Sequence, residues 1–533
     1  MDTKALRQKI LDLAIRGKLV PQDPNDEPAS VLLEKIREQK QQMFKEGKLK
    51  KKDIKNDSII FKGEDNLHYE KFQDGTVKCI EDEIPFEVPE GWAWCRLYSL
   101  SVKIGAGSTP TGGAAVYTTS GIKFIRSQNV YNDGLILNDV AYISEEINQK
   151  KSGSIVKPKD ILLNITGGSI GRCALVPDEF DIANVNQHVM IIRLTNIEFR
   201  KYIHSVITSS YIQKQIFSRQ VGSGRGGLSA ETLSTFLIPL PPRNEQILIT
   251  DKLNDCISQI LTIANEQCKI NDLVSKAKAK ILDLAIRGKL VPQNPDDEPA
   301  SVLLERIRAE KEELIKQGKI KRDKKESIIF KGEDNSYYEK IGNKLNCIDE
   351  QLPFKLPDGW SYERLGNICS IARGGSPRPI ENYLTDAEDG LNWIKIGDTE
   401  QGGKYIYSTK EKIRPEGVSK TRYVHCGDFL LTNSMSFGRP YILKTDGCIH
   451  DGWLVIGDVE AVFIQDYLYY MLSSSIMYDL LSRLAAGSTV KNLKSDSVKS
   501  LIVPIPPRKE QDKISKHIEN VFSIISLIEE SLN

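Results

Sequence analysis

Ile10–Gln22 reads ILDLAIRGKLVPQ, and Ile281–Gln293 repeats the same thirteen residues without a change. Four further stretches recur at a distance of 265 to 271 residues. They are DEPASVLLE (Asp26–Glu34, Asp297–Glu305), SIIFKGEDN (Ser58–Asn66, Ser327–Asn335), PFxxPxGW (Pro85–Trp92, Pro353–Trp360) and PxPPRxEQ (Pro239–Gln246, Pro504–Gln511). This period far exceeds the roughly 20–50 residues of solenoid repeats, so it indicates a duplicated domain unit. Between the last two motifs the copies match only sparsely. A shared frame therefore holds two different variable blocks, which predicts one kind of task on two different targets.

The composition favours a soluble, multidomain chain. A length of 533 residues with 40% hydrophobic residues allows about three or four domains, each with its own core. No apolar run approaches the ~18 residues that span a bilayer, and the charged N-terminal stretch lacks a signal peptide. The nine cysteines form no CxxC pair, so we expect neither disulfides nor zinc, and a cytoplasmic location. A net charge of +1 argues against indiscriminate binding of polyanions but allows local basic patches.

Apolar residues after Gln246 follow the alternating spacing of four and three that is typical of a coiled coil. The seam consists of Ile249, Leu253, Cys256, Ile260, Ile263, Gln267, Ile270, Val274, Ala277, Ile281 and Leu284. Pro241 and Pro242 stop the helix upstream, and Gly288 with Pro292 ends it downstream. The pattern predicts a helix over 244–287, roughly 65 Å long at ~1.5 Å per residue.

The two ends of the chain carry the same seam in two pieces. The C-terminal piece, matching the first half of the central seam, contains Ile514, Ile518, Val521, Ile525, Ile528 and Leu532. The N-terminal piece, matching the second half, contains Leu6, Ile10 and Leu13. A pseudo-two-fold axis would place the central helix antiparallel to this split helix, with the variable blocks at opposite ends. The alternative is that each seam packs only on its own domain.

The predicted fold is therefore mixed α/β, with two variable domains joined by two long antiparallel coiled-coil helices in a pseudo-two-fold internal repeat. The predicted boundaries are 1–20 (N-terminal helix), 21–84 (basic helical arm and linker), 85–243 (first variable domain), 244–288 (central helix), 289–352 (second arm and linker), 353–508 (second variable domain) and 509–533 (C-terminal helix). The lysine-rich stretches 35–57 and 306–326 indicate solvated helical arms or arms that contact phosphates. Predicted strands are Ile122–Arg126, Asp160–Ile165, Val189–Leu194, Asn392–Ile396, Asp428–Thr432 and Trp453–Ile456.

Motifs of catalysis are missing from the sequence. There is no GxxxxGK[ST] phosphate loop, no Asn/Asp-Pro-Pro-Tyr/Phe motif for amino-group methylation, and no pair of histidines at metal-ligand spacing. Glu179 and Asp181 lie near Asn184 and Gln187, which suggests a metal-dependent nuclease cluster, but the second block has no equivalent. We therefore predict no catalytic residue and no metal ligand in this chain.

The variable blocks instead carry loops that suit DNA recognition. Arginine recognises guanine edges, asparagine and glutamine recognise adenine edges, and Gly-rich turns let the backbone approach phosphates. The candidate residues are Arg126, Gln128, Asn129, Arg172, Asn186, Gln187 and Arg225 in the first block, and Arg373, Arg378, Lys395, Arg422, Asn433, Arg439, Lys491 and Lys494 in the second. Asp160 with Gly171-Arg172, and Asp428 with Gly438-Arg439, are the clearest matched pair. Taken alone, each of these residues is more often an ordinary surface residue, so the prediction depends on their recurrence at matched places.

Taken together, these motifs resemble the specificity subunit of type I restriction–modification enzymes over essentially the whole chain. PxGW opens each block, PxPPRxEQ closes it before a heptad helix, and LAIRGKLVPQ with DEPASVLLE follows the helix. The resemblance implies two target recognition domains, each recognising half of a split sequence in double-stranded DNA. It also implies two methyltransferase subunits as partners and, in the full complex, motor–nuclease subunits. S-adenosylmethionine, ATP and Mg would belong to those partners, and no cofactor to this chain.

Two other function classes compete with this interpretation. A self-sufficient methyltransferase or nuclease is disfavoured because its motifs are missing. A coiled-coil scaffold or adhesin with two unlike binding heads is the second alternative.

Overall fold

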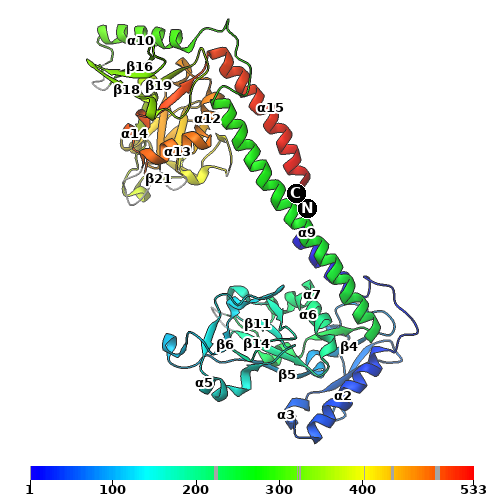
Figure 1. Cartoon of the computed structure of the whole chain (residues 1–533). Helices are drawn as coiled ribbons and strands as arrows, with labels where there is room; N and C mark the ends of the chain where they lie inside the picture. Colours follow the sequence, from blue (N-terminus) through cyan, green and yellow to red (C-terminus); the bar gives the residue numbers. More distant parts are fainter. Residues whose placement is uncertain are drawn as a thin grey trace. The chain divides into compact units, whose positions relative to one another are not determined.

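The computed structural model describes residues 2–220, 226–320, 322, 326–400, 402–433, 437–485 and 492–532. The chain forms two compact units, residues 1–266 and 267–533, whose boundary falls within the long helix α9 (Figure 1). In the described part of the chain no helix is long and apolar enough to cross a membrane.

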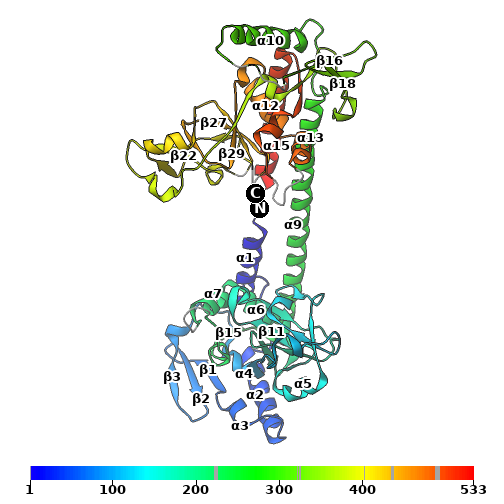
Figure 2. The same ribbon diagram turned by 90° about the vertical axis from the view of Figure 1, so that its left-hand side faces the viewer.

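Helix α9, Arg243–Ile286, lies within one residue of the predicted span. In the first unit, α1 (Thr3–Ile15) packs beside the start of α9; in the second unit, α15 (Arg508–Leu532) packs beside its end (Figures 1 and 2). The second pair is antiparallel, because Lys278 pairs with Glu529 at 2.7 Å whereas Gln293, beyond the end of α9, binds Glu510 at the start of α15. Each terminal helix therefore pairs with one half of α9, and a continuous two-helix coiled coil stays a prediction.

Most predicted seam residues lie on the inner faces of these helices. Buried are Ile249, Leu253, Ile260, Val274, Ile514, Ile518 and Ile525; half-buried are Leu6, Ile10, Leu13, Ile270, Ile281, Leu284 and Val521. The prediction is wrong for Ile528, which is 45% exposed while its neighbour Glu529 faces α9. Ile263 and Ala277 are also exposed. An α-helix has 3.6 residues per turn and drifts ~20° per heptad, so its inner stripe moves away from a strict 3.5-residue seam, which accounts for all three exposed residues.

Each variable domain is built on two sheets, and all six predicted strands are confirmed. The first domain has the strand orders β12-β11-β14-β5 and β10-β13-β6-β9, and the second has β20-β29-β26-β27-β23 and β21-β24-β22-β28-β25. In the first domain the strands are β5 (Ser101–Ala106), β6 (Ile122–Ile125), β9 (Ala141–Ile143), β10 (Ile155–Val156), β11 (Ile161–Asn164), β12 (Cys173–Leu175), β13 (Ala183–Val185) and β14 (Val189–Leu194). In the second they are β20 (Ser370–Arg373), β21 (Leu384–Thr385), β22 (Leu391–Ile394), β23 (Tyr405–Ile406), β24 (Glu411–Ile413), β25 (Arg422–Val424), β26 (Phe429–Thr432), β27 (Pro440–Leu443), β28 (Gly447–Ile449) and β29 (Trp453–Gly457).

A short antiparallel pair joins the beginning of each variable domain to its end. It consists of β4 (Ala93–Arg96) with β15 (Leu237–Leu240) in the first domain, and of β19 (Ser361–Arg364) with β30 (Ile502–Ile505) in the second. Three helices precede the last strand: α6 (Arg200–Thr208), α7 (Ser210–Ser218) and α8 (Ala230–Ser234), or α12 (Gln465–Leu472), α13 (Ser475–Leu484) and α14 (Ser495–Lys499). The apolar faces of these helices are buried in one large core per unit.

The arms contain more sheet than the sequence predicted. Helix α2 (Ala29–Lys45) and helix α10 (Ala300–Lys316) confirm the helical part, and α3 (Lys51–Ile54) adds one turn. The repeated motif SIIFK, however, forms the first strand of a three-stranded antiparallel sheet in each unit. The strands are β1 (Ser58–Lys62), β2 (His68–Phe72) and β3 (Val77–Cys79), and β16 (Ser327–Lys331), β17 (Tyr337–Ile341) and β18 (Lys344–Cys347). Lysine content obscured the alternating pattern of these short strands.

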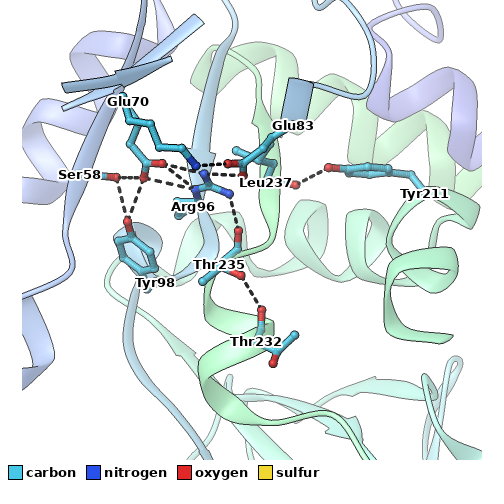
Figure 3. Close-up of polar contacts among 10 residues, drawn as sticks. Ser58, Glu70, Glu83, Arg96, Tyr98, Tyr211, Thr232, Thr235 and Leu237 are labelled. Atoms are coloured by element: carbon cyan, nitrogen blue, oxygen red, sulfur yellow. Dashed lines mark hydrogen bonds and ion pairs between the residues drawn. The ribbon is translucent and has the colours of Figure 1, made fainter. Parts of the chain in front are cut away.

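Buried ion pairs fix each arm sheet to its variable domain. Arg96, at the end of β4, binds Glu70 of β2 at 2.7 Å and Glu83 at 2.8 Å, and it also donates to the Thr235 carbonyl (Figure 3). In the second unit Arg364 and Glu339 form the same pair. Separating such a pair would leave a buried charge without a partner, which is costly. The ion pairs therefore hold the arm sheet in a defined position on its variable domain.

Three of the repeated motifs meet in one hydrogen-bonded knot. The Trp92 indole N–H donates to Glu245 at 2.8 Å, and the Gln22 amide donates to the same carboxylate at 3.1 Å. Trp360, Glu510 and Gln293 repeat this contact in the second unit at 2.9 and 3.1 Å. The knot ties PxGW, PxPPRxEQ and KLVPQ together, which explains in physical terms why these three motifs recur.

Candidate DNA-binding surface

In the first variable domain, loops far apart in the sequence meet at one polar surface. The Asn164 amide donates to the Ser127 carbonyl at 2.8 Å, and Thr166 lies 2.5 Å from the imidazole Nδ1 of His188. Thr166 also forms a β-bridge with Gly227. Thr109 donates to the side chain of Gln187, which is exposed. The loops after β5, β6 and β11, the loop before β14, and the residues before α8 therefore share one surface.

In the second variable domain, the equivalent loops gather around Asp451. The Asp451 carboxylate accepts a hydrogen bond from Ser376 at 2.9 Å and lies 3.4 Å from Arg378 and 3.0 Å from His450. Its backbone carbonyl accepts from Arg373 at 2.9 Å and from Asn433 at 2.8 Å. The side chain and the backbone carbonyl of Asp451 thus bring together three segments of the domain: the end of β20 with the loop after it, the residue after β26, and the loop after β28.

The two surfaces share one backbone frame. Strand β13 runs parallel to β6 with Val185 opposite Ile125, and β28 runs parallel to β22 with Ile449 opposite Ile394. In both domains a glycine N–H donates to the residue four positions beyond the aligned strand residue: Gly107 to the Val189 carbonyl at 3.1 Å, and Gly374 to the Trp453 carbonyl at 3.0 Å. Gln187 and Asp451, each two residues beyond the aligned strand residue, therefore occupy matched positions. Arg126 and Lys395, directly after β6 and β22, form a second matched pair.

The predicted match of Arg172 and Arg439 is confirmed by their hairpins. Gly171 and Gly438 both have positive φ values, +86° and +70°. The Gly171 N–H donates to Asn164, and that of Gly438 to Thr432, each at 2.9 Å. The surroundings of the two arginines differ: Arg172 is half-buried with its guanidinium 4.6 Å from the ring centroid of Tyr131, whereas Arg439 is exposed.

Three predicted asparagines are buried, which corrects their proposed role as readers of bases. Asn129 is fully buried and accepts from the Arg126 N–H at 3.0 Å while donating to Ile136 and Asp139. Asn186, 6% exposed, accepts from the backbone N–H of His188. Asn433, fully buried, donates to the Asp451 carbonyl. Asn129 and Asn186 cap turns locally, a common use of asparagine that the loop composition could not separate from DNA contact. Asn433 instead links two loops of its domain.

The remaining predicted residues divide by exposure. Gln128, Gln187, Arg373, Arg378, Arg422, Arg439 and Lys494 are exposed, whereas Arg126, Arg172 and Lys395 are half-buried. Lys395 pairs with Glu411. Arg225 and Lys491 lie outside the described residues. Contact of any of these residues with DNA stays a prediction.

Sequence reasoning missed the residues that connect the loops. Contacts between loops bring these residues to the two surfaces, and no spacing rule predicts such contacts. They are Thr109, Thr166, Ser376, His450 and Asp451. Ser376, between the predicted Arg373 and Arg378, and His188, adjacent to the predicted Gln187, could have been found by proximity.

Asp451 is the charged centre of the second surface. Burial alone would raise the pKa of its carboxyl group, but the hydrogen bond from Ser376 and the charges of His450, Arg373 and Arg378 lower the pKa below its ordinary value. Burial lowers the pKa of His450, an effect that Asp451 opposes. At neutral pH Asp451 is therefore an anion that faces arginines.

Among the described residues, no group of three or more His, Cys, Asp or Glu side chains could hold a metal ion. Asp181, considered for a nuclease cluster, pairs with Lys123 instead. All nine cysteines are free thiols.

Comparisons with known proteins agree with this organisation. A family model described as Type I restriction modification DNA specificity domain matches residues 89–272 and 357–533. The specificity subunit of the type I restriction enzyme EcoEI from Escherichia coli is 25% identical over 610 aligned positions, covering 99% of this chain and 90% of the relative. That of EcoAI, also from Escherichia coli, is 29% identical over 433 positions, covering 70% of this chain and 63% of the relative.

A solved structure concerned with complex assembly of the type I restriction–modification system resembles the fold. The TM-score is 0.55 at 17% identity, covering 84% of this chain and 94% of the other. The family model matches well over half of the sequence, once in each repeat. The chain therefore belongs to the family of type I restriction–modification DNA specificity subunits.

Proposed function

We propose that this chain is the sequence-specific DNA-recognition subunit of a type I restriction–modification complex, and that each variable domain recognises one half of a bipartite, asymmetric target. The observation that carries the proposal is the matched frame with different side chains. Gln187 in the first domain and Asp451 in the second occupy the same backbone position. An amide and a carboxylate present different hydrogen-bonding groups, so the two half-sites should differ in sequence.

The helices supply the second part of the proposal. On α15, Ile524, Leu527 and Ile528 lie on one side of the helix and are 59%, 65% and 45% exposed. On α9, Leu273 in the second unit and Leu261 in the first are also exposed. Apolar residues at i, i+3 and i+4 suit the apolar face of a partner helix. We infer that these stripes bind two methyltransferase subunits, and that α9 with the two terminal helices forms a continuous antiparallel coiled coil.

Catalysis belongs to the partners in this proposal. The methyltransferase subunits carry S-adenosylmethionine, and restriction subunits, where they join, carry ATP and Mg. The chain itself contributes recognition in the cytoplasm, where the host DNA lies. An adhesin or scaffold role is not favoured, because family membership assigns the variable domains to DNA specificity.

The test is to map methylated bases in cells that contain the methyltransferase subunit with and without this chain. We expect methylation that depends on this chain, at sites with two unlike half-sites separated by unspecified bases. Methylation at unchanged sites without the chain would contradict the proposal.

A further inference from the structure

The arm sheets present the same solvent-facing surface in both units, although the variable domains have diverged. In the first unit, Phe61 lies opposite Tyr69 and Ile59 opposite Lys71; Tyr69 and Lys71 in turn lie opposite Cys79 and Val77. Residues directly opposite in antiparallel strands share a face of the sheet. We call this set the outer sheet face: Ile59, Phe61, Tyr69, Lys71, Val77 and Cys79.

The second unit repeats the outer sheet face position by position. Its members are Ile328, Phe330, Tyr338, Lys340, Leu345 and Cys347, joined by the same register. Five of the six residue types are identical, and the sixth is Leu345 in place of Val77. The apolar members are 37% to 49% exposed in the first unit and 40% to 56% in the second, apart from the half-buried tyrosines. Figure 2 shows each sheet at the margin of its own unit.

The hairpin turn holds the aromatic pair in place. The Tyr69 hydroxyl donates to Asp65 at 2.7 Å, and the Phe61 and Tyr69 rings stack with centroids 5.9 Å apart. A Cβ atom at Gly63 would come within 2.9 Å of the Tyr69 ring. In the second unit Tyr338 donates to Asp334 at 2.8 Å, and its ring centroid lies 6.1 Å from that of Phe330. The aromatic side chains of the outer sheet face are therefore held in one conformation before any partner binds. Fixing them costs conformational freedom, which a surface that only contacts water would not need to lose.

The identity of the two faces restricts what can bind them. The two variable domains are proposed to recognise different sequences, so DNA at the two ends would differ, whereas the faces do not. Carboxylates beside the aromatic rings, Asp65 and Asp334, disfavour the phosphates of a nucleic acid. A second copy of the chain is also excluded, because two self-complementary faces per chain would build open polymers instead of a closed complex. The occupant is a protein present in two identical copies.

The size of the face indicates that its occupant also binds elsewhere. Six side chains are fewer than the ~20–30 residues per partner of a stable interface. The occupant must therefore use another surface of the same unit, and the exposed stripe on the helices is such a surface. Lys71 and Lys340 lie at the centre of each face and make no ion pair with a described residue. We therefore expect a carboxylate of the partner opposite each of these lysines.

We propose that each outer sheet face binds one methyltransferase subunit, as a second contact beside the helical stripe, with a carboxylate of that subunit opposite Lys71 or Lys340. This inference rests on the proposed function. It adds a docking site outside the segments that the family model matches, since that model begins at residues 89 and 357.

The exposed thiols Cys79 and Cys347 allow a direct test. The full-length chain is alkylated with N-ethylmaleimide, alone and after assembly with purified methyltransferase subunit, and each cysteine is quantified by mass spectrometry. Alkylation of both thiols should slow about tenfold on assembly, because the core of an interface excludes solvent. Cys426, exposed on the second variable domain, should react at an unchanged rate.

Reversing the charge of the two central lysines is the second experiment. Lys71→Glu with Lys340→Glu should weaken binding of both methyltransferase copies about tenfold, because like charges would then face each other. Lys52→Glu, an exposed lysine of the arm that lies off the sheet, is the matched control and should leave the affinity unchanged. The binding constants are measured by sedimentation velocity at several salt concentrations.

The outcomes separate this inference from the proposed function. Unprotected thiols and an unchanged affinity, in a complex that still methylates bipartite sites, would overturn the docking site alone. Protection that appears only with restriction subunits, or with single-stranded nucleic acid, would overturn the choice of the methyltransferase subunit. A chain that binds no methyltransferase subunit at all would overturn both.

Discussion

At the scale of single residues, the second recognition surface depends on Asp451. We predict that Asp451→Asn lowers the affinity of the assembled complex for its target by about 1–3 kcal/mol and relaxes the half-site of the second domain. The amide keeps the size of the side chain but removes the charge that faces Arg373 and Arg378. The measurement is binding to a set of targets with one base changed at a time. Glu388→Gln, at an exposed carboxylate of the same domain, is the control; equal specificity in both variants would refute the role of Asp451.

The matched arginines give a second prediction at this scale. Arg172→Ala and Arg439→Ala should each affect one half-site only. Loss of a base contact should cost about 1–3 kcal/mol and relax one position, whereas loss of a phosphate contact should weaken binding to all sequences alike. Fluorescence anisotropy with specific and scrambled DNA distinguishes the two cases. If neither variant changes the affinity, these arginines do not lie on the DNA.

The sequence predicted which residue types form the two surfaces better than it predicted where their side chains lie. Gly171-Arg172 and Gly438-Arg439 were found because a repeated glycine before an arginine survives in both copies. Asn129, Asn186 and Asn433 were misplaced, because an asparagine that bonds to the protein's own backbone and one that reads adenine look alike in a sequence. Asp451 was missed, since its importance comes from loops that meet only after folding.

At the scale of elements, the knot between Trp92, Gln22 and Glu245 holds each helix to its domain. We predict that Glu245→Ala with Glu510→Ala lowers the free energy of unfolding by about 1–3 kcal/mol per site, because buried donors lose their acceptor. Glu245→Gln with Glu510→Gln keeps one acceptor oxygen and should cost less. Thermal and urea unfolding, compared in the same buffer, measure the difference; equal stability of all three proteins would show that the knot is dispensable.

The same glutamates give stability a defined dependence on pH. Burial raises the pKa of Glu245 and of Glu510, although the hydrogen bonds from the Gln and Trp side chains oppose the change. The folded chain therefore holds these protons more tightly than the unfolded chain. Their contribution to stability is greatest below the ordinary pKa of glutamate and falls as pH rises through the raised pKa. The double glutamine variant should lose this part of the pH dependence.

The central helix is the element that we expect to set the spacing between half-sites. One heptad inserted near Gln267, matched by one near the C-terminus, should separate the domains by about 10 Å at ~1.5 Å per residue. B-DNA advances ~3.4 Å per base pair, so the spacer should lengthen by about one to three base pairs after bending or twisting of the DNA. Both half-site sequences should stay the same. An active complex with an unchanged spacer would show that the helices do not measure the distance.

The helices were the most predictable elements, and the arm sheets the least. Proline and glycine at both ends, with a regular apolar stripe between them, predicted α9 to within one residue. The stripe itself drifts from the strict heptad, so Ile528 is exposed and Glu529 faces α9. The arm strands are only three to five residues long and lie between charged segments, which hides the alternation of inward and outward side chains.

At the scale of the whole molecule, duplication explains both what is constant and what varies. Under the proposed function, the helices, the knot and the outer sheet face recur because both units bind the same partners with the same packing. The loops differ because each unit is proposed to bind different DNA. This division leads to the central claim, that the two variable domains are independent readers of two unlike half-sites.

One measurement tests that claim most directly. Residues 92–239 are replaced by the corresponding block of another family member, and the methylated sites of the host genome are mapped with the original and the exchanged chain. The claim predicts that one half-site changes, while the other half-site and the spacer stay as they were. A change in both half-sites, or a target that is continuous or perfectly palindromic, would contradict it.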